Sequence, residues 1–316
     1  MDRTVAFPNE CDGVVGAPHQ LGRYFDLLGT CSVIDVGGQA TLSCWKSGTG
    51  PPVVLLHGLL GTALHWSLVA PMLAEQFAVY VPELIFGGHS TAAGEAVDVS
   101  VGGQAALVAG LLETLDLHDV CVVGNDTGAT IVQILAVNFP TRLGAAVISD
   151  GDAFENLPPA VFKYLCWLAR FPRVLTASFR LMSIKPILRS PIAHGWLSKR
   201  PIPPPIVHHY LRLFRRSETR GDLVRFLRGV NNAPTLGIAK RFGEIRFPTL
   251  IAWSKQDRVF PVAHAQRLTE AIPGARLVLC DDSYAYLPFD QPNWLSDQIM
   301  SFMSSNLATD QRSSPR

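Results

Sequence analysis

The segment Gly124-Asn125-Asp126-Thr127-Gly128 decides how the rest of the chain is interpreted. It ends an apolar run over residues 120–123 and opens a helical stretch over residues 127–138. Two glycines bracket one reactive side chain, which is the layout of a strained strand-to-helix turn that presents a nucleophile. Glycine suits both outer positions because neighbouring backbone there lies too close for a Cβ atom. Gly-x-Asp-x-Gly is also a common turn, so the motif gains meaning only from its context.

The middle residue of this turn is an aspartate, where a serine is more usual. A carboxylate attacks carbon centres that carry leaving groups, or esters and epoxides, and forms a covalent ester intermediate. Asp126 is therefore the candidate nucleophile.

Two further apolar segments give the turn its context. Residues 52–61 predict a buried strand that stops at the glycine turn His57-Gly58 and leads into a helix over residues 63–77. Residues 248–253 predict another strand, followed by a polar loop that ends in Asp257. Strands that alternate with helices of this length imply a parallel sheet with both faces covered. Ligands bind at the carboxyl ends of such strands, where His57, Asp126 and Asp257 all fall.

On these three motifs, in this order, the chain resembles the α/β-hydrolase family over residues 24–307. The aspartate at the turn narrows the resemblance to the branch of haloalkane dehalogenases and epoxide hydrolases. The resemblance implies an α/β class, with a mostly parallel eight-stranded sheet, flanking helices and an inserted helical cap.

The expected organisation is an N-terminal arm (1–22), a core (23–151 and 235–307), a cap (152–234) and a disordered tail (308–316). Pro158-Pro159 and the run Pro201 to Pro205 divide the cap into amphipathic helical stretches, in which basic residues alternate with large apolar ones. A membrane-surface patch is the alternative interpretation of this region. A lid packed against the core is favoured, because one apolar helix face usually serves that purpose. The other predicted core elements are a hairpin (31–36 and 39–45), strands at 78–82, 144–149 and 276–280, and helices at 99–117, 264–272 and 294–303.

The resemblance also implies roles for site residues. The backbone N–H groups of Leu59 and Thr127 would form the oxyanion hole. Asp257 matches the acid that orients a catalytic histidine, and Asp150 matches the place where some haloalkane dehalogenases put that acid. Asp150 could equally be a cap hinge or a helix N-cap.

The catalytic histidine of the family is missing. In the loop after the last strand, alignment on Pro288 and Gln291-Pro292 places Ala285 at the histidine position, and no histidine follows His264. A positioned general base contributes roughly 10² to 10⁴ in rate, so hydrolytic turnover is in question. His89 is the candidate substitute base, because its loop follows a strand; a solvated loop histidine is the simpler interpretation. The remaining histidines are assigned to structural, helix, cap or arm positions.

Two other functions stay open. Asp126 could act as a general base in an isomerisation, elimination or addition, since burial raises the pKa of a carboxyl group. The site could also bind a ligand without turnover. A specific dehalogenase is weakly supported, because Thr127 stands where a halide-binding tryptophan often follows the nucleophile. Tyr164 and Tyr210 lie in the cap, where epoxide hydrolases place acidic tyrosines, but the sequence does not orient them.

Composition limits the remaining classes. The chain has 316 residues, 48% of them hydrophobic, which suffices for one large core and a lid. A net charge of +1 gives no broad basic field for nucleic acid. No apolar run could span a bilayer, and Met1-Asp2-Arg3 does not begin a secretory signal. Six cysteines without metal-ligand spacing favour a cytoplasmic location, and no metal or organic cofactor is expected. The expected partner is a small apolar substrate; the oligomeric state is not predicted.

Overall fold

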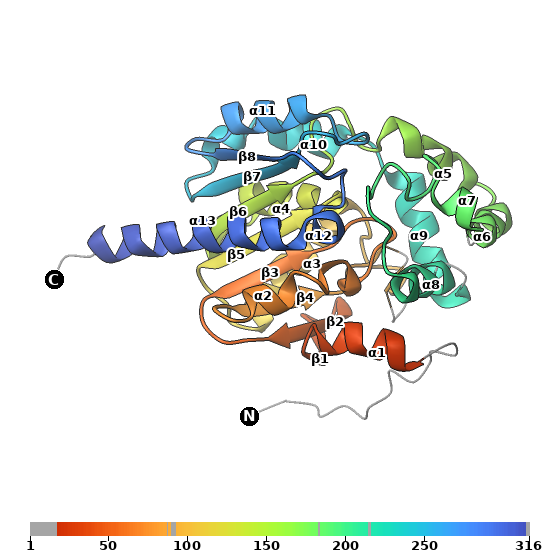
Figure 1. The fold of residues 1–316 in the computed structure, drawn as a ribbon, viewed down its shortest axis with the longest axis horizontal. Coiled ribbons are helices and arrows are strands. Elements are labelled where there is room, and N and C mark those ends of the chain that lie inside the picture. Colours follow the sequence, from red (N-terminus) through yellow and green to blue (C-terminus); the bar gives the residue numbers. More distant parts are fainter. Residues whose placement is uncertain (1–17, 87, 90–92, 183, 214–215, 314–316) are drawn as a thin grey trace.

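Eight strands form one mixed sheet in the computed structural model, which describes all residues except 1–17, 87, 90–92, 183, 214–215 and 314–316 (Figure 1). The strands are β1 (Thr30–Val36), β2 (Ala40–Ser47), β3 (Pro52–Leu56), β4 (Ala78–Pro82), β5 (Val120–Asn125), β6 (Leu143–Ser149), β7 (Thr249–Ser254) and β8 (Arg276–Cys280). Their order is β1-β2-β4-β3-β5-β6-β7-β8, and β2 runs antiparallel to both of its neighbours while β3 to β8 are parallel. The predicted α/β-hydrolase fold with a mostly parallel eight-stranded sheet is confirmed.

Helices cover both faces of the sheet. They are α1 (Pro18–Asp26), α2 (Ala70–Leu73), α3 (Val101–Thr114), α4 (Thr127–Asn138), α5 (Lys163–Leu168), α6 (Pro172–Leu181), α7 (Lys185–Leu188), α8 (Pro204–Leu213), α9 (Ser217–Gly229), α10 (Ala233–Ala239), α11 (Val262–Ala271), α12 (Leu287–Asp290) and α13 (Pro292–Ser313). The short 3₁₀ turns are η1 (Ala63–Trp66), η2 (Pro140–Arg142), η3 (Ala160–Phe162) and η4 (Phe242–Glu244). In Figure 1, α2 and α13 lie on one face of the sheet and α3 and α4 on the other.

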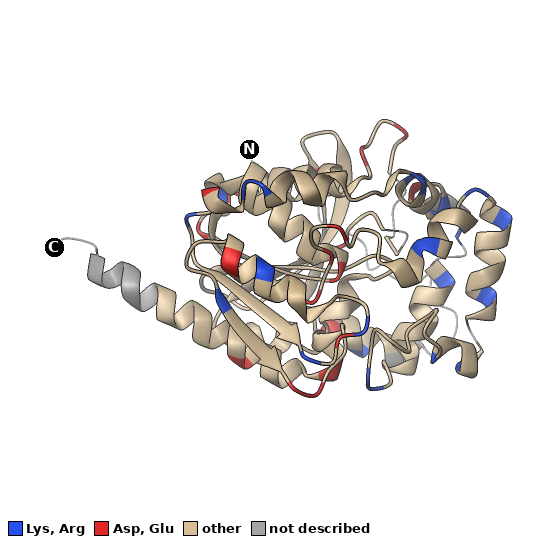
Figure 2. Cartoon of the chain, turned by 90° about the horizontal axis from the view of Figure 1, so that it is seen from above, with Lys and Arg blue, Asp and Glu red and all other residues tan. Residues whose placement is uncertain are grey.

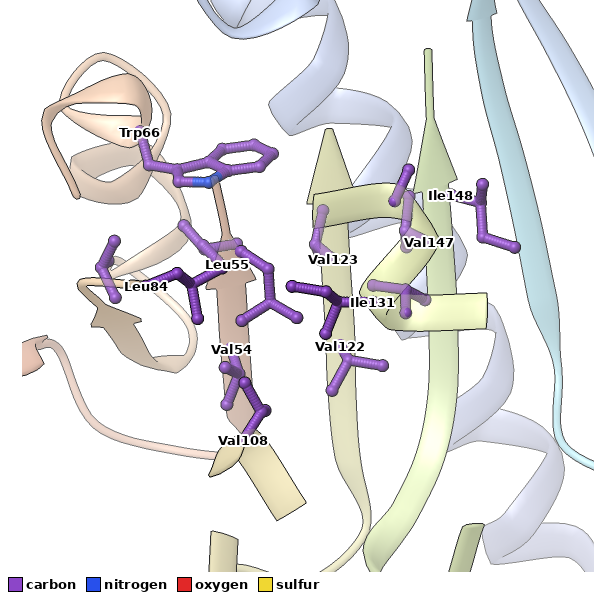
Figure 3. Packing of buried hydrophobic residues seen from close by; sticks show 14 of the residues in the cluster. Val54, Leu55, Trp66, Leu84, Val108, Val122, Val123, Ile131, Val147 and Ile148 are labelled. Carbon is purple, nitrogen blue, oxygen red and sulfur yellow. The ribbon is translucent and has the colours of Figure 1, made fainter. Parts of the chain in front are cut away.

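The central strands are buried along their whole length, which explains their continuous apolar sequences. Every residue of β5 and β7 is buried, as expected for parallel strands with helices on both faces. Figure 3 shows Leu55 of β3 beside Val122 and Val123 of β5, with Ile131 of α4 packed against them. This packing fixes the strand ends that carry the candidate site.

The helical insert lies between β6 and β7, over the carboxyl ends of the parallel strands. It spans residues 160–239, from η3 to α10, and covers most of the region predicted to be a cap. Prolines at the first turns of α6, α7 and α8 start short helices there, because proline lacks only an N–H that a first turn leaves unpaired.

Several element boundaries differ from the sequence prediction. The helix predicted over residues 63–77 is two pieces, η1 and α2, because Pro71 can be accommodated only in a first turn. Helix α13 continues to Ser313, through much of the tail that was predicted to be disordered. Most of the predicted arm lies outside the described residues, and α1 begins at Pro18. Among the described helices, none is both long enough and apolar enough to cross a membrane.

Leu55→Ala should destabilise the fold strongly, because this side chain is fully buried in β3. We expect a loss of about 2–5 kcal/mol in the free energy of unfolding, measured by urea titration. Leu236→Ala on α10 is the matched control, since its side chain is 40% exposed, and should cost far less. Equal losses for the two variants would contradict this description of the core.

Candidate active site

Asp126 sits at a sharp turn between β5 and α4. Its backbone has a positive φ of 60° with ψ of −132°, a strained combination for a residue with a side chain. A Cβ atom at Gly124 would collide with the backbone of Gly128, and one at Gly128 would collide with the carbonyl of Leu56. The two bracketing glycines are therefore required by close backbone approach, as the motif predicts.

One oxygen of the Asp126 carboxylate is held by the donors that were predicted to form the oxyanion hole. Oδ1 accepts hydrogen bonds from Leu59 N–H at 3.2 Å and from Thr127 N–H at 2.5 Å. The Thr127 hydroxyl donates a third hydrogen bond to the same atom, at 2.9 Å. No described residue donates to Oδ2, and the Asp126 side chain lines a cavity. The carboxylate thus has one fixed oxygen and one that is unengaged.

The turn after β3 brings Leu59 to this position. His57 is fully buried, and its Nε2 accepts a hydrogen bond from Leu84 N–H, so its proton lies on Nδ1 and is donated to the carbonyl of Gly58. Burial lowers the pKa of His57 to about 3, which keeps the ring neutral. Leu60 follows with a positive φ of 58°. His57 is thus a structural residue that shapes the turn.

Asp152, which the sequence analysis did not select, also lines the cavity. Its Oδ2 lies 3.4 Å from the Thr127 hydroxyl oxygen, which is the donor at this longer contact as it is to Asp126. The Thr127 hydroxyl group therefore links the two carboxyl groups. The side chain is 1% exposed, and its Oδ1 atom has no hydrogen-bond partner.

Burial, followed by the charge of Asp126, raises the pKa of Asp152 well above its usual range. Burial raises the pKa of Asp126 only to about 6, because Thr127 and Leu59 donate hydrogen bonds to its carboxylate. Both carboxyl groups are therefore easier to protonate than an exposed aspartate. The short sequence Ser149-Asp150-Gly151-Asp152 at the end of β6 was the available signal for this second acid.

Asp150 and Asp257 form a second buried pair of carboxyl groups. Asp150 accepts hydrogen bonds from the backbone N–H and hydroxyl of Ser254, and Asp257 accepts from the N–H groups of Val259 and Phe260. Burial raises the pKa of both groups, that of Asp257 to about 7, and the charge of Asp257 raises the pKa of Asp150 further. Asp257 Oδ2 has no hydrogen-bond partner among the described residues. The two acid positions that the resemblance offered as alternatives are therefore adjacent in space.

Ala285 is fully buried, with its carbonyl 2.9 Å from the Nδ2 atom of Asn125, which donates to it. Asp290 holds this loop against the cap by accepting hydrogen bonds from the N–H groups of Tyr284, Lys199 and Arg200. The position predicted for a histidine is thus filled by a methyl group in a well-anchored loop.

The structure places His89 in a different environment from the one predicted for a base. Its Nε2 lies 2.9 Å from Asp222 Oδ2 on cap helix α9, and it is not among the residues that line the cavity. His194 of the cap does line the cavity; burial lowers its pKa to about 4, and its Nδ1 has no hydrogen-bond partner. Sequence reasoning assigned His194 to a cap position without a role, because nothing in its neighbours marks it.

The cavity lies between the sheet and the cap, and its empty space is about 800 Å³ including its opening to solvent. Apolar side chains dominate its lining, with Asp126, Asp152, Thr127 and Tyr286 among the few polar ones. Tyr164 lines it too, but its hydroxyl donates to the carbonyl of Ile192. Neither Tyr210 nor any tryptophan is among the described lining residues. This space suits a medium-sized apolar molecule.

In the described part of the chain, no three His, Cys, Asp or Glu side chains are arranged to hold a metal ion.

Comparison with known proteins gives a family match over most of the chain. The family model described as alpha/beta hydrolase fold matches residues 51–292. A 2-hydroxy-6-oxononadienedioate/2-hydroxy-6-oxononatrienedioate hydrolase of Cupriavidus pinatubonensis is 23% identical over 87% of this chain and 94% of its own length. A haloalkane dehalogenase of Mycolicibacterium paratuberculosis is 31% identical over 44% of this chain and 47% of its own length.

Solved structures show the same fold at low sequence identity. A putative lipase of Acinetobacter baumannii AYE has a TM-score of 0.76 at 20% identity, covering 95% of this chain and 99% of its own. The carboxylesterase CesB of Bacillus subtilis has a TM-score of 0.71 at 17% identity, covering 92% and 99%.

The Asp150–Asp257 pair should make stability depend on pH in an unusual direction. Because the folded-state pKa of Asp257 is raised from 3.8 to about 7, the native state binds more protons than the unfolded state between these values. The free energy of unfolding should therefore fall as pH rises from about 4 to 7. Asp257→Asn removes this titrating group and should flatten the dependence in urea titrations at several pH values. An unchanged slope would contradict the raised pKa of Asp257.

Proposed function

Because this chain belongs to the α/β-hydrolase fold family, we propose that it is a hydrolase in which Asp126 forms a covalent ester with a small apolar substrate. We further propose that the substrate is an epoxide or a comparably strained ether. The observation that carries this proposal is the position of Asp126 Oδ1, which occupies the donors of Leu59 and Thr127 itself.

The occupied donors argue against an esterase. Acyl transfer from an ester substrate needs free N–H groups for the oxygen of the substrate carbonyl. Here the carboxylate of the enzyme fills that place, so the Leu59 and Thr127 donors can stabilise only an oxyanion that forms on Asp126. This arrangement suits attack by Oδ2 on a saturated carbon, followed by attack of water on the resulting Asp126 ester.

The carboxyl group of Asp152 favours an epoxide oxygen over a halide as the leaving group. A halide leaves without a proton and needs N–H donors, and no tryptophan is found among the described lining residues. An epoxide oxygen must gain a proton as its carbon–oxygen bond breaks. We assign that proton to Asp152, whose carboxyl group lies in the cavity beside Thr127 and whose pKa is raised by burial. Tyr286, whose pKa is raised by burial and then by the Asp126 charge, is a second neutral donor in the same cavity.

The first half of the reaction uses these two carboxyl groups together. Asp126 Oδ2 attacks an epoxide carbon, the carbon–oxygen bond opens, and the proton of Asp152 moves to the departing oxygen. The products of this step are a hydroxyalkyl ester of Asp126 and an ionised Asp152.

In the second half, the Asp152 carboxylate takes a proton from water as the water oxygen attacks Cγ of Asp126. Negative charge builds on Oδ1, where Leu59 and Thr127 already donate hydrogen bonds. The intermediate then expels the alcohol oxygen, which takes the carboxyl proton of Asp126. The cycle consumes one epoxide and one water, releases a diol, and restores both aspartates. Asp150 and Asp257 take no step in it, and their pairing supports the loop behind the site.

A non-hydrolytic reaction, with Asp126 as a general base, is the second candidate. The observation that favours it is the methyl group of Ala285 at the position of the family histidine. The two candidate reactions differ in whether an oxygen atom from water ends up in Asp126 or in the product. In a single turnover in heavy-oxygen water, a nucleophilic Asp126 acquires the label while the product stays unlabelled. A base-assisted attack of water labels the product instead, and a reaction without water labels neither.

Substitutions at the two aspartates should separate their roles. Asp126→Asn should abolish turnover of aryl and aliphatic epoxides, because the nucleophile is lost. Asp152→Asn should slow the water step by about 10² to 10⁴, while Tyr286 still supplies a proton for ester formation, so that an adduct on Asp126 accumulates in intact-mass spectra. Asp257→Asn is the matched control and should retain turnover. Wild-type activity only on p-nitrophenyl esters would overturn the epoxide assignment, and absence of any adduct would overturn the nucleophile.

The pH profile gives an independent check. Because the pKa of Asp126 is raised to about 6 and only its carboxylate can attack, kcat/KM for an epoxide should rise with pH through this range. It should level off above about 7, where Asp126 is ionised. A rate that falls between pH 5 and 7 would exclude this assignment of protons.

A further inference from the structure

The outer face of the cap exposes large apolar side chains. Among the described residues, the six most exposed large hydrophobic side chains lie between residues 167 and 192, each at least 50% exposed. They are Trp167, Phe171, Val174, Leu181, Ile184 and Ile192, which together define the cap patch. The three others, on the rest of the molecule, are 37–40% exposed. In Figure 1, α6 and α7 lie at the end of the molecule opposite the C-terminus.

Helix α6 shows that this exposure is not a by-product of packing. Leu175 and Phe179, one turn apart, are buried and face the protein. Val174 and Leu181 are two turns apart on the outward side, where Arg173 and Arg180 are also exposed. At the start of the helix, the rings of Trp167 and Phe171 lie 5.6 Å apart. The outer surface of α6 is thus both apolar and cationic.

Charge is distributed very unevenly along the chain. Residues 156–217 contain eleven Lys or Arg and no Asp or Glu, whereas the other 254 residues carry 16 basic and 26 acidic side chains. The overall charge of +1 therefore conceals a strongly cationic segment. Figure 2 shows blue segments on the cap helices and most of the red segments over the sheet domain. Among the described residues, no carboxylate forms a salt bridge with Arg173 or Arg180.

The cap patch is continuous with the cavity of the candidate active site. Ile192 is half exposed and also lines the cavity, and its carbonyl accepts a hydrogen bond from Tyr164, another lining residue. Phe162 and Pro158, both partly exposed, line the cavity from the same segment. An apolar molecule can therefore pass from the outer face of the cap to Asp126 along an apolar surface.

We propose that the cap patch docks on the surface of an anionic lipid bilayer, with its apolar side chains inserted between headgroups and its arginines and lysines against lipid phosphates. Basic residues interleaved with exposed Trp, Phe, Leu and Ile on short helices are the chemistry that such interfaces select. Long cationic side chains reach the headgroups while their stems remain in apolar surroundings. A nucleic acid offers no comparable partner for Val174, Leu181 and Ile184, and a second copy would bring two cationic faces together.

Vesicle flotation tests this proposal without reference to catalysis. The full-length protein should float with vesicles of phosphatidylcholine mixed with phosphatidylglycerol, and not with phosphatidylcholine alone. Binding should weaken as salt is raised, because exposed charges are screened. Arg173→Glu/Arg180→Glu should weaken binding by at least about tenfold. Trp167→Ser/Phe171→Ser should weaken it through lost apolar insertion, with both variants melting near the wild-type temperature.

Matched controls carry the same changes away from the cap patch. Lys240→Glu/Arg276→Glu makes the same change in charge elsewhere on the surface. Leu27→Ser/Phe139→Ser removes exposed apolar side chains from the surface of the sheet domain. Both control variants should bind vesicles like the wild type. Equal binding to neutral and anionic vesicles, or equal losses in the control variants, would overturn the proposal. So would a dimer that Trp167→Ser/Phe171→Ser dissociates while no variant binds vesicles, or binding to nucleic acid in place of vesicles.

Discussion

The three hydrogen bonds to Asp126 Oδ1 are the constraint on which the site depends. They come from two turns that are 67 residues apart in sequence, and they meet because β3 and β5 are neighbours in a parallel sheet. A carboxylate that fills its own oxyanion hole cannot share the donors with a substrate carbonyl. In the proposed mechanism, the same donors leave one oxygen free to attack and stabilise negative charge on the other when the ester is hydrolysed.

Ala285, which was predicted to stand at the position of the family histidine, has no group that could exchange a proton with Asp126. Asp126, Asp150, Asp152 and Asp257 are all largely buried, and burial raises the pKa of each. Like charges close together disfavour one another's ionised forms, which adds to this rise. In the proposed mechanism, a neighbouring carboxylic acid supplies the proton that an imidazole would otherwise carry.

The sequence predicted the fold and the central turn well, because both depend on local patterns. Apolar runs, glycine turns and the order of motifs located β3, β5 and β7, and the glycines around Asp126 marked the strained turn. The partners of Asp126 could be predicted only partly. Leu59 and Thr127 followed from the resemblance, but Asp152 did not, because its role depends on a shared contact with Thr127 that no sequence spacing reveals. The opposite holds for His89. It was predicted to belong to the site because its loop follows a strand, but its imidazole contacts the carboxylate of Asp222 on the cap.

The positive φ angles of Leu60 and Asp126 place conformational strain on both sides of the same hydrogen bonds. At position 60 a glycine would adopt this backbone more easily, so evolution toward greater thermal tolerance would favour it. That exchange would also let the turn sample other conformations, so the position of the adjacent Leu59 N–H would vary more. A glycine at position 60 would therefore stabilise the fold, but it would hold the N–H donor to Asp126 less firmly in place.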